Sequence, residues 1–233
     1  MNPSPTLSNS ILDAIGDTPL VEVARLAQAQ NLNGRLLVKC EYLNPGSSKK
    51  DRIALEMIRE AKAKGDLRPK QVVIELTSGN TGTGLAIVCR ALDHPFVAVM
   101  SRGNTMERAR MMRALGAEVV LVDRAPGSLP NQVSGDDLAR VEERAQELTR
   151  ERGAYRCDQF NLAGNCLAHE RTTGPEIWQQ AGGQIDIFLD FAETAGTWTG
   201  VMRTLKRMNP EVRGYLVEPR EAAVLAGSEI SQY

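Results

Sequence analysis

The sequence of 233 residues has few of the side chains that bind metals and almost no net charge. It has only two histidines, His94 and His169, and its four cysteines form no C-x-x-C pair. We therefore expect no metal site, and we expect the thiols to be buried and reduced, as in a cytoplasmic protein. The net charge of −1 gives no electrostatic attraction to nucleic acid or to an anionic membrane, so neither is an expected partner.

Long apolar runs are also missing. No segment is apolar over the length that spans a bilayer. The opening residues, MNPSP, lack the basic stretch and apolar core of a signal peptide, so we expect none. The composition is otherwise ordinary, with 42% hydrophobic and 24% charged residues, and it fits a globular protein of one large or two small domains.

Short apolar segments alternate with helical patterns along the chain. This order predicts an α/β fold with parallel sheets, and the absence of polar alternation within the strands predicts helices on both sheet faces. Ligands of such folds bind at the carboxyl ends of strands, so the segments after residues 41, 75 and 189 are the candidate site. The expected strands lie at 36–41, 72–75, 96–100, 119–122, 185–189 and 215–217, and the expected helices at 50–64, 82–91, 105–114, 136–152 and 200–207.

The first candidate segment, residues 44–52 (NPGSSKKDR), places Lys49 and Lys50 where a helix begins. The helix dipole favours acids rather than lysines at that end. A lysine in a partly dry pocket can form a Schiff base with a carbonyl compound. A solvated helix start capped by Ser47 or Ser48 explains the same residues, and spacing alone slightly favours it.

The second segment, residues 77–84 (TSGNTGTG), has small polar residues and glycines before a helix. Its exposed N–H groups and hydroxyls suit a carboxylate or a phosphate. A plain strand-to-helix turn is the alternative, although it needs fewer hydroxyls. The segment lacks both the G-K-[ST] ending of a P-loop and the G-x-G-x-x-G fingerprint. The third segment, residues 193–200 (ETAGTWTG), could be a second anion site, but Glu193 favours an ordinary loop.

Taken together, these segments resemble the fold-type II pyridoxal-phosphate (PLP) enzymes, most closely the cysteine synthase and cystathionine β-synthase family. The resemblance runs over nearly the whole chain. Residues 16–20 (GDTPL) resemble the family motif G-x-T-P-L, and residues 44–52 resemble N-P-x-x-S-x-K-D-R. Residues 77–82 are identical to the family loop T-S-G-N-T-G. Residues 159–161, together with 165, 169 and 172–177, resemble the family segment Q-F-x-N … H-x-x-T-T-G-P-E-I.

The resemblance implies two parallel-sheet domains of the tryptophan synthase β-like kind. The smaller α/β domain would comprise residues 36–155 and carry the Schiff-base lysine and the substrate loop. The larger would comprise residues 1–35 and 156–233. It would be incomplete at its C-terminus, because the family continues well beyond the V-E-P strand end that residues 217–219 resemble, whereas this chain stops at Tyr233.

The resemblance also implies the site and the reaction. Lys50 would hold PLP as a Schiff base, with Lys49 an ordinary neighbour, and would move the α-proton of the substrate. An O-activated serine such as O-acetylserine would lose its β-substituent, and the resulting aminoacrylate would add sulfide or a thiol to give cysteine or a derivative. A cytoplasmic homodimer is implied. The other cofactor contacts would be Asn80, Thr194, Gly196 and Thr197, and the substrate carboxylate would meet Thr77, Ser78, Gly79, Asn80, Thr81 and Gln159.

The phosphate-binding loop departs from the family pattern. The family reads G-T-G-G-T where this chain has ETAGT at 193–197. At about 4 Å and an effective dielectric of about 20, each unit of like charge between Glu193 and a phosphate costs about 4 kcal/mol. The departure supports a second interpretation: a non-catalytic relative that has lost efficient PLP binding and serves a binding or regulatory role. A third, a deaminase acting on serine or threonine, agrees less well with segments 159–161 and 172–176.

Overall fold

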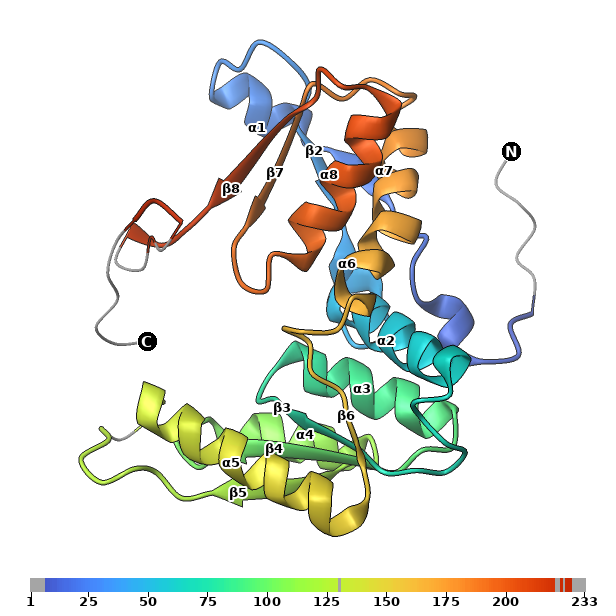
Figure 1. Ribbon diagram of the computed structural model, residues 1–233. Coiled ribbons are helices and arrows are strands. Elements are labelled where there is room, and N and C mark those ends of the chain that lie inside the picture. Colours follow the sequence, from blue (N-terminus) through green and yellow to red (C-terminus); the bar gives the residue numbers. More distant parts are fainter. Residues whose placement is uncertain (1–6, 130, 221–222, 224, 228–233) are drawn as a thin grey trace.

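The computed structural model describes residues 7–129, 131–220, 223 and 225–227. Two groups of strands and helices lie at opposite ends of the molecule, with α2 and α3 between them (Figure 1). In chain order the elements are η1 (Ile11–Ala14), β1 (Leu20–Glu22), α1 (Ala24–Ala29), β2 (Leu37–Lys39), η2 (Glu41–Leu43), α2 (Lys50–Lys64), β3 (Val73–Leu76), α3 (Asn80–Ala91), β4 (Phe96–Ser101), α4 (Met106–Ala114), β5 (Glu118–Val122), α5 (Gly135–Arg152), β6 (Tyr155–Arg156), α6 (Gly164–Ala168), η3 (His169–Thr173), α7 (Gly174–Gln180), β7 (Ile187–Phe191), α8 (Gly196–Met208) and β8 (Arg213–Val217).

A four-stranded parallel sheet, in the order β5-β4-β3-β6, forms one end of the molecule. The chain moves outward from β3 to β4 and β5, and α5 then carries it back to β6 on the other side of β3. The direction of winding therefore reverses between β3 and β6. In open α/β sheets the loops at the carboxyl ends of two such strands form the ligand-binding crevice. The loops after Leu76 and Arg156 occupy this position.

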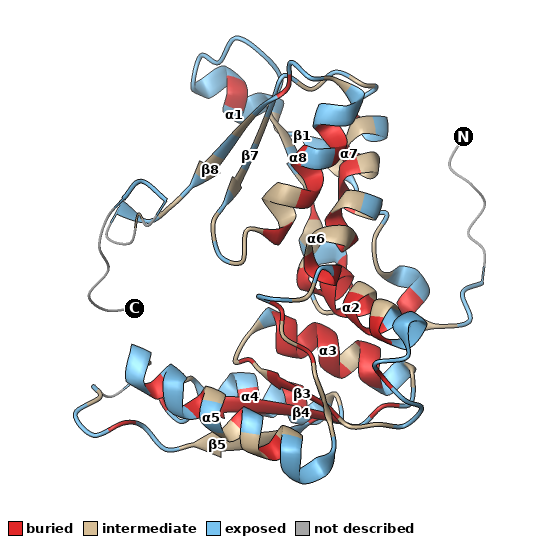
Figure 2. Ribbon diagram, viewed as in Figure 1, coloured by how far each residue is buried: buried red, intermediate tan, exposed pale blue. Residues whose placement is uncertain are grey.

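Helices cover both faces of this sheet, as the sequence predicts. Every residue of β4 is buried. On one face Ile74 and Val97 pack with Val141 and Leu148 of α5. On the other face the apolar residues of the sheet pack with those of α2, α3 and α4. Figure 2 shows in red the buried residues of the sheet and of these helices. Burial on both faces explains why these strands are apolar without alternation.

The parallel pair β7 and β8 differs from that pattern. Helix α8 packs on one face through an apolar cluster that includes Val201 and Leu205. The other face is exposed, so the expectation of helices on both faces is wrong for this pair; its large apolar residues are Ile187, Leu189, Phe191, Tyr215 and Val217. Strand β7 also runs over Ile187–Phe191 instead of 185–189, because it pairs with β8 along those five residues. Asp190 within it forms an ion pair with Lys49.

Strands β1 and β2 form an antiparallel pair, with Leu20 opposite Lys39, so not every sheet is parallel. The pairing joins residues on either side of the predicted domain boundary at residue 36, and the pairing of β6 with β3 starts at the predicted boundary at 155. The division into two domains stays a prediction. Tyr233, on which the predicted incompleteness of the larger domain rests, lies outside the described residues.

Across the part of the chain that the structure describes, no helix has the length and apolar character needed to cross a membrane. Within the same residues, no three histidine, cysteine, aspartate or glutamate side chains are grouped in a way that could hold a metal ion.

Candidate active site

Lys50 is the first residue of α2 and is only 7% exposed. Its Nζ lies 2.7 Å from Oε2 of Glu193. Its backbone N–H donates to Oγ of Ser48 at 3.2 Å, which supplies a partial cap for the helix. Helix α3 packs closely here, since a Cβ added at Gly84 would lie 3.0 Å from the Lys50 carbonyl oxygen. The interpretation of Lys50 as a solvated helix-start residue is therefore wrong.

Lys49 also faces the segment after β7. Its Nζ lies 2.9 Å from both carboxylate oxygens of Asp190 and 4.6 Å from the ring centroid of Phe191. The sequence gives Lys49 no role, and the structure gives it a specific partner 141 residues away. Both lysines therefore join the start of α2 to residues 190–193.

The loop after β3 is held in shape by its own polar groups. Oγ1 of Thr77 accepts a hydrogen bond from the backbone N–H of Gly82 at 2.9 Å, which fixes the first turn of α3. Gly79 is the N-cap residue of that helix, and Asn80, its first residue, is exposed. The carbonyl oxygen of Ser78 accepts from Nη1 of Arg108 at 3.3 Å. The start of α3 thus presents hydroxyls and N–H groups in a fixed arrangement.

A chain of hydrogen bonds links this loop to the loop before α8. The buried Thr81 hydroxyl donates to Oε1 of Gln159 at 2.6 Å. Nδ2 of Asn165 donates to the carbonyl oxygen of Gln159 at 2.8 Å and to Oγ1 of Thr194 at 3.0 Å. Glu75, at the end of the apolar strand β3, accepts from the Gln159 backbone N–H at 3.4 Å. Two predicted binding segments are therefore one connected unit.

A buried histidine, His169, contacts the first turn of α8. Nε2 of His169 lies 3.2 Å from Oγ1 of Thr197, and its Nδ1 lies 2.9 Å from Oγ1 of Thr173. Burial holds the pKa of His169 well below its ordinary value, and the nearby charges of Lys49, Arg52 and Lys50 lower it further. A neutral ring therefore positions the Thr197 hydroxyl. His169 opens a π-helical turn, a rare feature that is frequent at functional sites.

Thr18, in the motif at residues 16–20, takes part in a network of ion pairs and hydrogen bonds around Arg52. Arg52 binds Glu41 through Nε at 2.7 Å and Glu176 through Nη1 at 2.6 Å, and its Nη2 donates to Thr18 at 3.1 Å. Lys39 adds a second cation to Glu176 at 2.6 Å. These contacts raise the pKa of Arg52 despite its burial, so the cation is permanent. This network around Arg52 links α2 to the N-terminal motif and to α7.

These residues fit an aldehyde that carries a phosphate. Lys50 offers a buried amine. The hydroxyls of Thr194, in the loop before α8, and of Thr197, in the first turn of α8, lie at the N-terminus of this 13-residue helix, where anions are favoured. Ala195 takes φ 55°, and a side chain at Gly196 would collide with the Asn165 amide, so the loop is tightly shaped. The Glu193 carboxylate is the element that fits least well.

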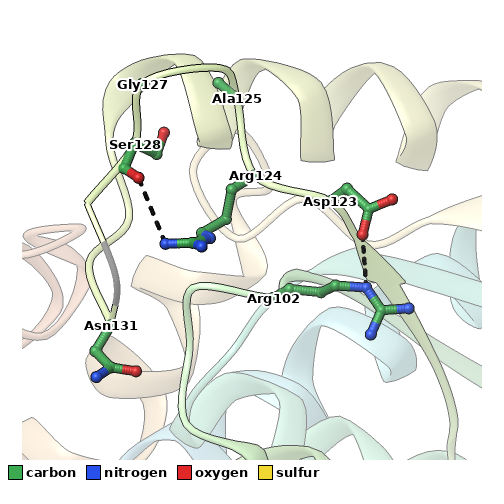
Figure 3. A pocket seen from close by; sticks show the side chains of 7 residues that line it. All are labelled: Arg102, Asp123, Arg124, Ala125, Gly127, Ser128 and Asn131. Atoms are coloured by element: carbon green, nitrogen blue, oxygen red, sulfur yellow. Dashed lines mark hydrogen bonds and ion pairs between the residues drawn. The ribbon is translucent and has the colours of Figure 1, made fainter.

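A cavity of about 550 Å³ lies at the carboxyl ends of β4 and β5 (Figure 3). Within it Nε of Arg102 lies 2.7 Å from Asp123, and Arg124 donates to the carbonyl oxygen of Ser128 at 3.4 Å. The cavity contains none of the predicted site residues; its lining is Arg102, Asp123, Arg124, Ala125, Gly127, Ser128 and Asn131. We therefore place the candidate active site at Lys50.

Comparison with known proteins agrees with this geometry. A family model described as pyridoxal-phosphate dependent enzyme matches residues 11–232. Cysteine synthase 3 of Caenorhabditis elegans is 43% identical over 216 residues, and cysteine synthase B of Pseudomonas aeruginosa is 40% identical over 218 residues. The crystal structure of O-acetyl serine sulfhydrylase isoform 3 from Entamoeba histolytica superimposes with a TM-score of 0.89 at 34% identity.

The matches cover almost all of this chain but only part of each relative. They include 92% of this chain with the C. elegans protein, 94% with the P. aeruginosa protein and 99% with the E. histolytica structure. The chain spans 61%, 69% and 67% of the lengths of those three proteins, respectively.

Proposed function

The chain belongs to the pyridoxal-phosphate dependent enzyme family, and within it we propose that this protein catalyses β-replacement on an O-activated serine. O-Acetylserine would react with sulfide or a thiol to give cysteine or a derivative, with release of acetate. One observation carries the proposal: Lys50 is buried, its backbone packs against Gly84 of α3, and its Nζ contacts Glu193 in the loop before α8. The similar cysteine synthases support the choice of substrate class.

The residues that would hold the cofactor are those predicted from the resemblance. Lys50 would bind the aldehyde carbon, Asn80 would contact the ring oxygen, and Thr194, Gly196 and Thr197 would hold the phosphate at the start of α8. When bound, pyridoxal phosphate supplies a covalent link to amino groups and withdraws electrons from the α-carbon of the substrate.

The chain's own residues would orient the substrate and move its proton. Residues 77–81 and Gln159 would hold the substrate carboxylate through hydroxyls, amide groups and backbone N–H groups. Their fixed arrangement reduces the entropy that must be lost in reaching the reactive geometry. Nζ of Lys50 would accept the proton of the α-carbon and return it after the nucleophile has added. Burial of Lys50 would keep bulk water away from that proton transfer.

The contact between Glu193 and Lys50 favours a second candidate. A carboxylate 2.7 Å from the amine competes with any aldehyde for that nitrogen. A protein with such a contact could be a non-catalytic relative that keeps the carboxylate-binding loop for binding or regulation. The two candidates differ in whether the chain takes up pyridoxal phosphate and releases acetate.

One experiment separates them. The purified chain is incubated with pyridoxal phosphate, dialysed, and given O-acetylserine and sulfide, while cysteine and acetate are quantified. We expect both products in equal amounts, a visible absorbance band that shifts when O-acetylserine is added, and neither signal in Lys50→Ala. Binding of O-acetylserine without any band or product would favour the non-catalytic candidate instead.

We further propose a cytoplasmic homodimer of two-domain subunits, with a small amino acid as substrate and no nucleic-acid or membrane partner. The net charge of −1 supports the last point. The exposed apolar residues of β7 and β8 offer surface for a protein contact. Sedimentation velocity of the purified chain tests the assembly, and a single species at 25.5 kDa would contradict it.

A further inference from the structure

The two lysines at the start of α2 are each paired with an acid from the short segment 190–193. Lys49 binds Asp190, and Lys50 binds Glu193. These residues belong to elements far apart in the sequence, so the two ion pairs are tertiary contacts. We call them the inner pair (Lys49–Asp190) and the outer pair (Lys50–Glu193).

The two pairs differ in how firmly they are held. In the inner pair both carboxylate oxygens of Asp190 lie 2.9 Å from Lys49, and the two side chains are only 14% and 19% exposed. In the outer pair one oxygen of Glu193 contacts Lys50, and the Glu193 side chain is 53% exposed. A half-exposed carboxylate can turn into water at little cost. The inner pair can therefore keep the segment docked while Glu193 moves.

The outer pair bears directly on the chemistry of Lys50. An amine attacks an aldehyde only through a free electron pair, and a carboxylate 2.7 Å from the nitrogen occupies space that the aldehyde has to enter. When the C=N bond forms, two hydrogens of the nitrogen leave with the aldehyde oxygen as water, and the nitrogen no longer has three donors for a carboxylate. The nitrogen then keeps at most one hydrogen, so the new carbon of the C=N bond and the Glu193 carboxylate compete for positions around it.

We propose that Glu193 is a positioning residue that occupies Lys50 and limits its reaction with the cofactor aldehyde. The proposal deepens, and rests on, the proposed function. It assigns to Glu193 an effect on the amine itself, separate from any repulsion between Glu193 and the cofactor phosphate. The carboxylate slows attachment and weakens the bound state, and its movement into water frees the amine.

A labelling experiment without any cofactor tests the effect on the amine. The chain is treated with a limiting amount of acetic anhydride, an uncharged reagent, and the acetylation rates of Lys50 and of the exposed Lys64 are measured by fragment mass spectrometry. In Glu193→Gln we expect the Lys50-to-Lys64 ratio to rise about two- to fivefold, the factor that a partly exposed ion pair confers. Glu211→Gln removes an exposed acid elsewhere and should leave the ratio unchanged.

A binding experiment connects the effect to the cofactor. Pyridoxal phosphate and pyridoxal, which lacks the phosphate, are titrated against the same three chains. We expect Glu193→Gln to bind both more tightly, with a larger gain for pyridoxal phosphate, and Glu211→Gln to match the parent chain. A gain confined to pyridoxal phosphate, with unchanged acetylation of Lys50, would overturn the proposal. Faster acetylation without uptake of either aldehyde would support the effect of Glu193 on the amine and would count against the proposed function.

Discussion

The hydroxyl of Thr81 donates a 2.6 Å hydrogen bond to Oε1 of Gln159, which lies 78 residues further along the chain. Thr81 is in the first turn of α3, and Gln159 follows β6. Strand order explains the contact, because β3 and β6 are neighbours at the point where the direction of winding reverses. The contact fixes Gln159 beside the loop that is proposed to hold the substrate carboxylate.

Thr81→Val removes the donor and preserves the shape of the side chain. A buried amide oxygen left without its partner costs about 1–3 kcal/mol. We expect the KM for O-acetylserine to rise about tenfold or more, as measured by steady-state kinetics. Thr81→Ser keeps the hydroxyl and should stay close to the parent chain. Equal KM values for the two variants would show that the hydrogen bond does not position the substrate.

Gly196 and Gly135 are both the first residues of long helices, which makes them a matched pair. A Cβ at Gly196 would collide with the side chain of Asn165, whereas a Cβ at Gly135 meets nothing within 4 Å. We expect Gly196→Ala to weaken binding of pyridoxal phosphate at least tenfold, and Gly135→Ala to leave binding unchanged. Absorbance titration measures both. Unaltered binding in Gly196→Ala would mean that the loop before α8 is not the phosphate site.

Asp137 stabilises the start of α5. Its carboxylate accepts from the backbone N–H groups of Ala125 at 2.6 Å and Ser134 at 2.8 Å, and also from the Ser134 hydroxyl. Asp137→Ala should lower the free energy of unfolding by about 2 kcal/mol, because it removes a cap and leaves a buried N–H unpaired. The neighbouring exposed Asp136→Ala should cost no more than about 0.5 kcal/mol. Urea unfolding at pH 7 compares the two variants.

The same hydrogen bonds make the contribution of Asp137 depend on pH. They lower its pKa from 3.8 to about 2, with the Ser134 backbone N–H the largest cause. The stabilisation is therefore complete above about pH 4 and is lost as the pH falls towards 2. The stability difference between the parent chain and Asp137→Ala should shrink over that range. A difference that stays constant to pH 2 would contradict the assignment.

Asp51 should give a pH dependence of opposite sign. Burial raises its pKa from 3.8 to about 6, against a hydrogen bond from the Gly46 backbone N–H that lowers it. The folded chain then holds this proton more tightly than the unfolded chain, so stability is lost as the pH rises from about 4 to about 6. Asp51→Asn cannot ionise and should lack this loss. The urea midpoints of unfolding of both chains, measured at half-unit pH intervals, test this prediction. If the midpoints of the two chains change with pH in parallel, the prediction is contradicted.

Local patterns in the sequence were sufficient to predict three strands of the four-stranded sheet, β3, β4 and β5, and the helices between them. They did not predict β6, which has only two residues, or its place beside β3. The apolar residues Ile53, Met57, Ile58 and Ala61 predict α2 with its observed limits, and Gly65 ends it with φ 81°. Burial of that sheet on two faces follows from the same kind of pattern. The predicted strand at 185–189 begins and ends two residues before the observed β7, Ile187–Phe191, and the charge of Asp190 within β7 is balanced by Lys49, a residue distant in the sequence.

The candidate site was less accessible to such reasoning. Residue spacing alone did not decide whether Lys50 is part of a solvated helix start or forms a Schiff base, and only the family resemblance selected the second role. The partners of the two lysines could not be predicted, since an acid at residue 190 or 193 is an ordinary surface residue until the fold brings it to α2. Physical reasoning identified Glu193 as unfavourable near a phosphate, but its contact with Lys50 required the structure.

The most direct test of the account asks which amine binds the cofactor. The chain is incubated with pyridoxal phosphate, reduced with borohydride to make any C=N bond permanent, digested, and sequenced by mass spectrometry. We expect the pyridoxyl group on Lys50, no modification of Lys49 above the level found on exposed lysines, and loss of the specific signal in Lys50→Ala. A modification concentrated on another lysine, or none at Lys50 under saturating cofactor, would contradict the central claim.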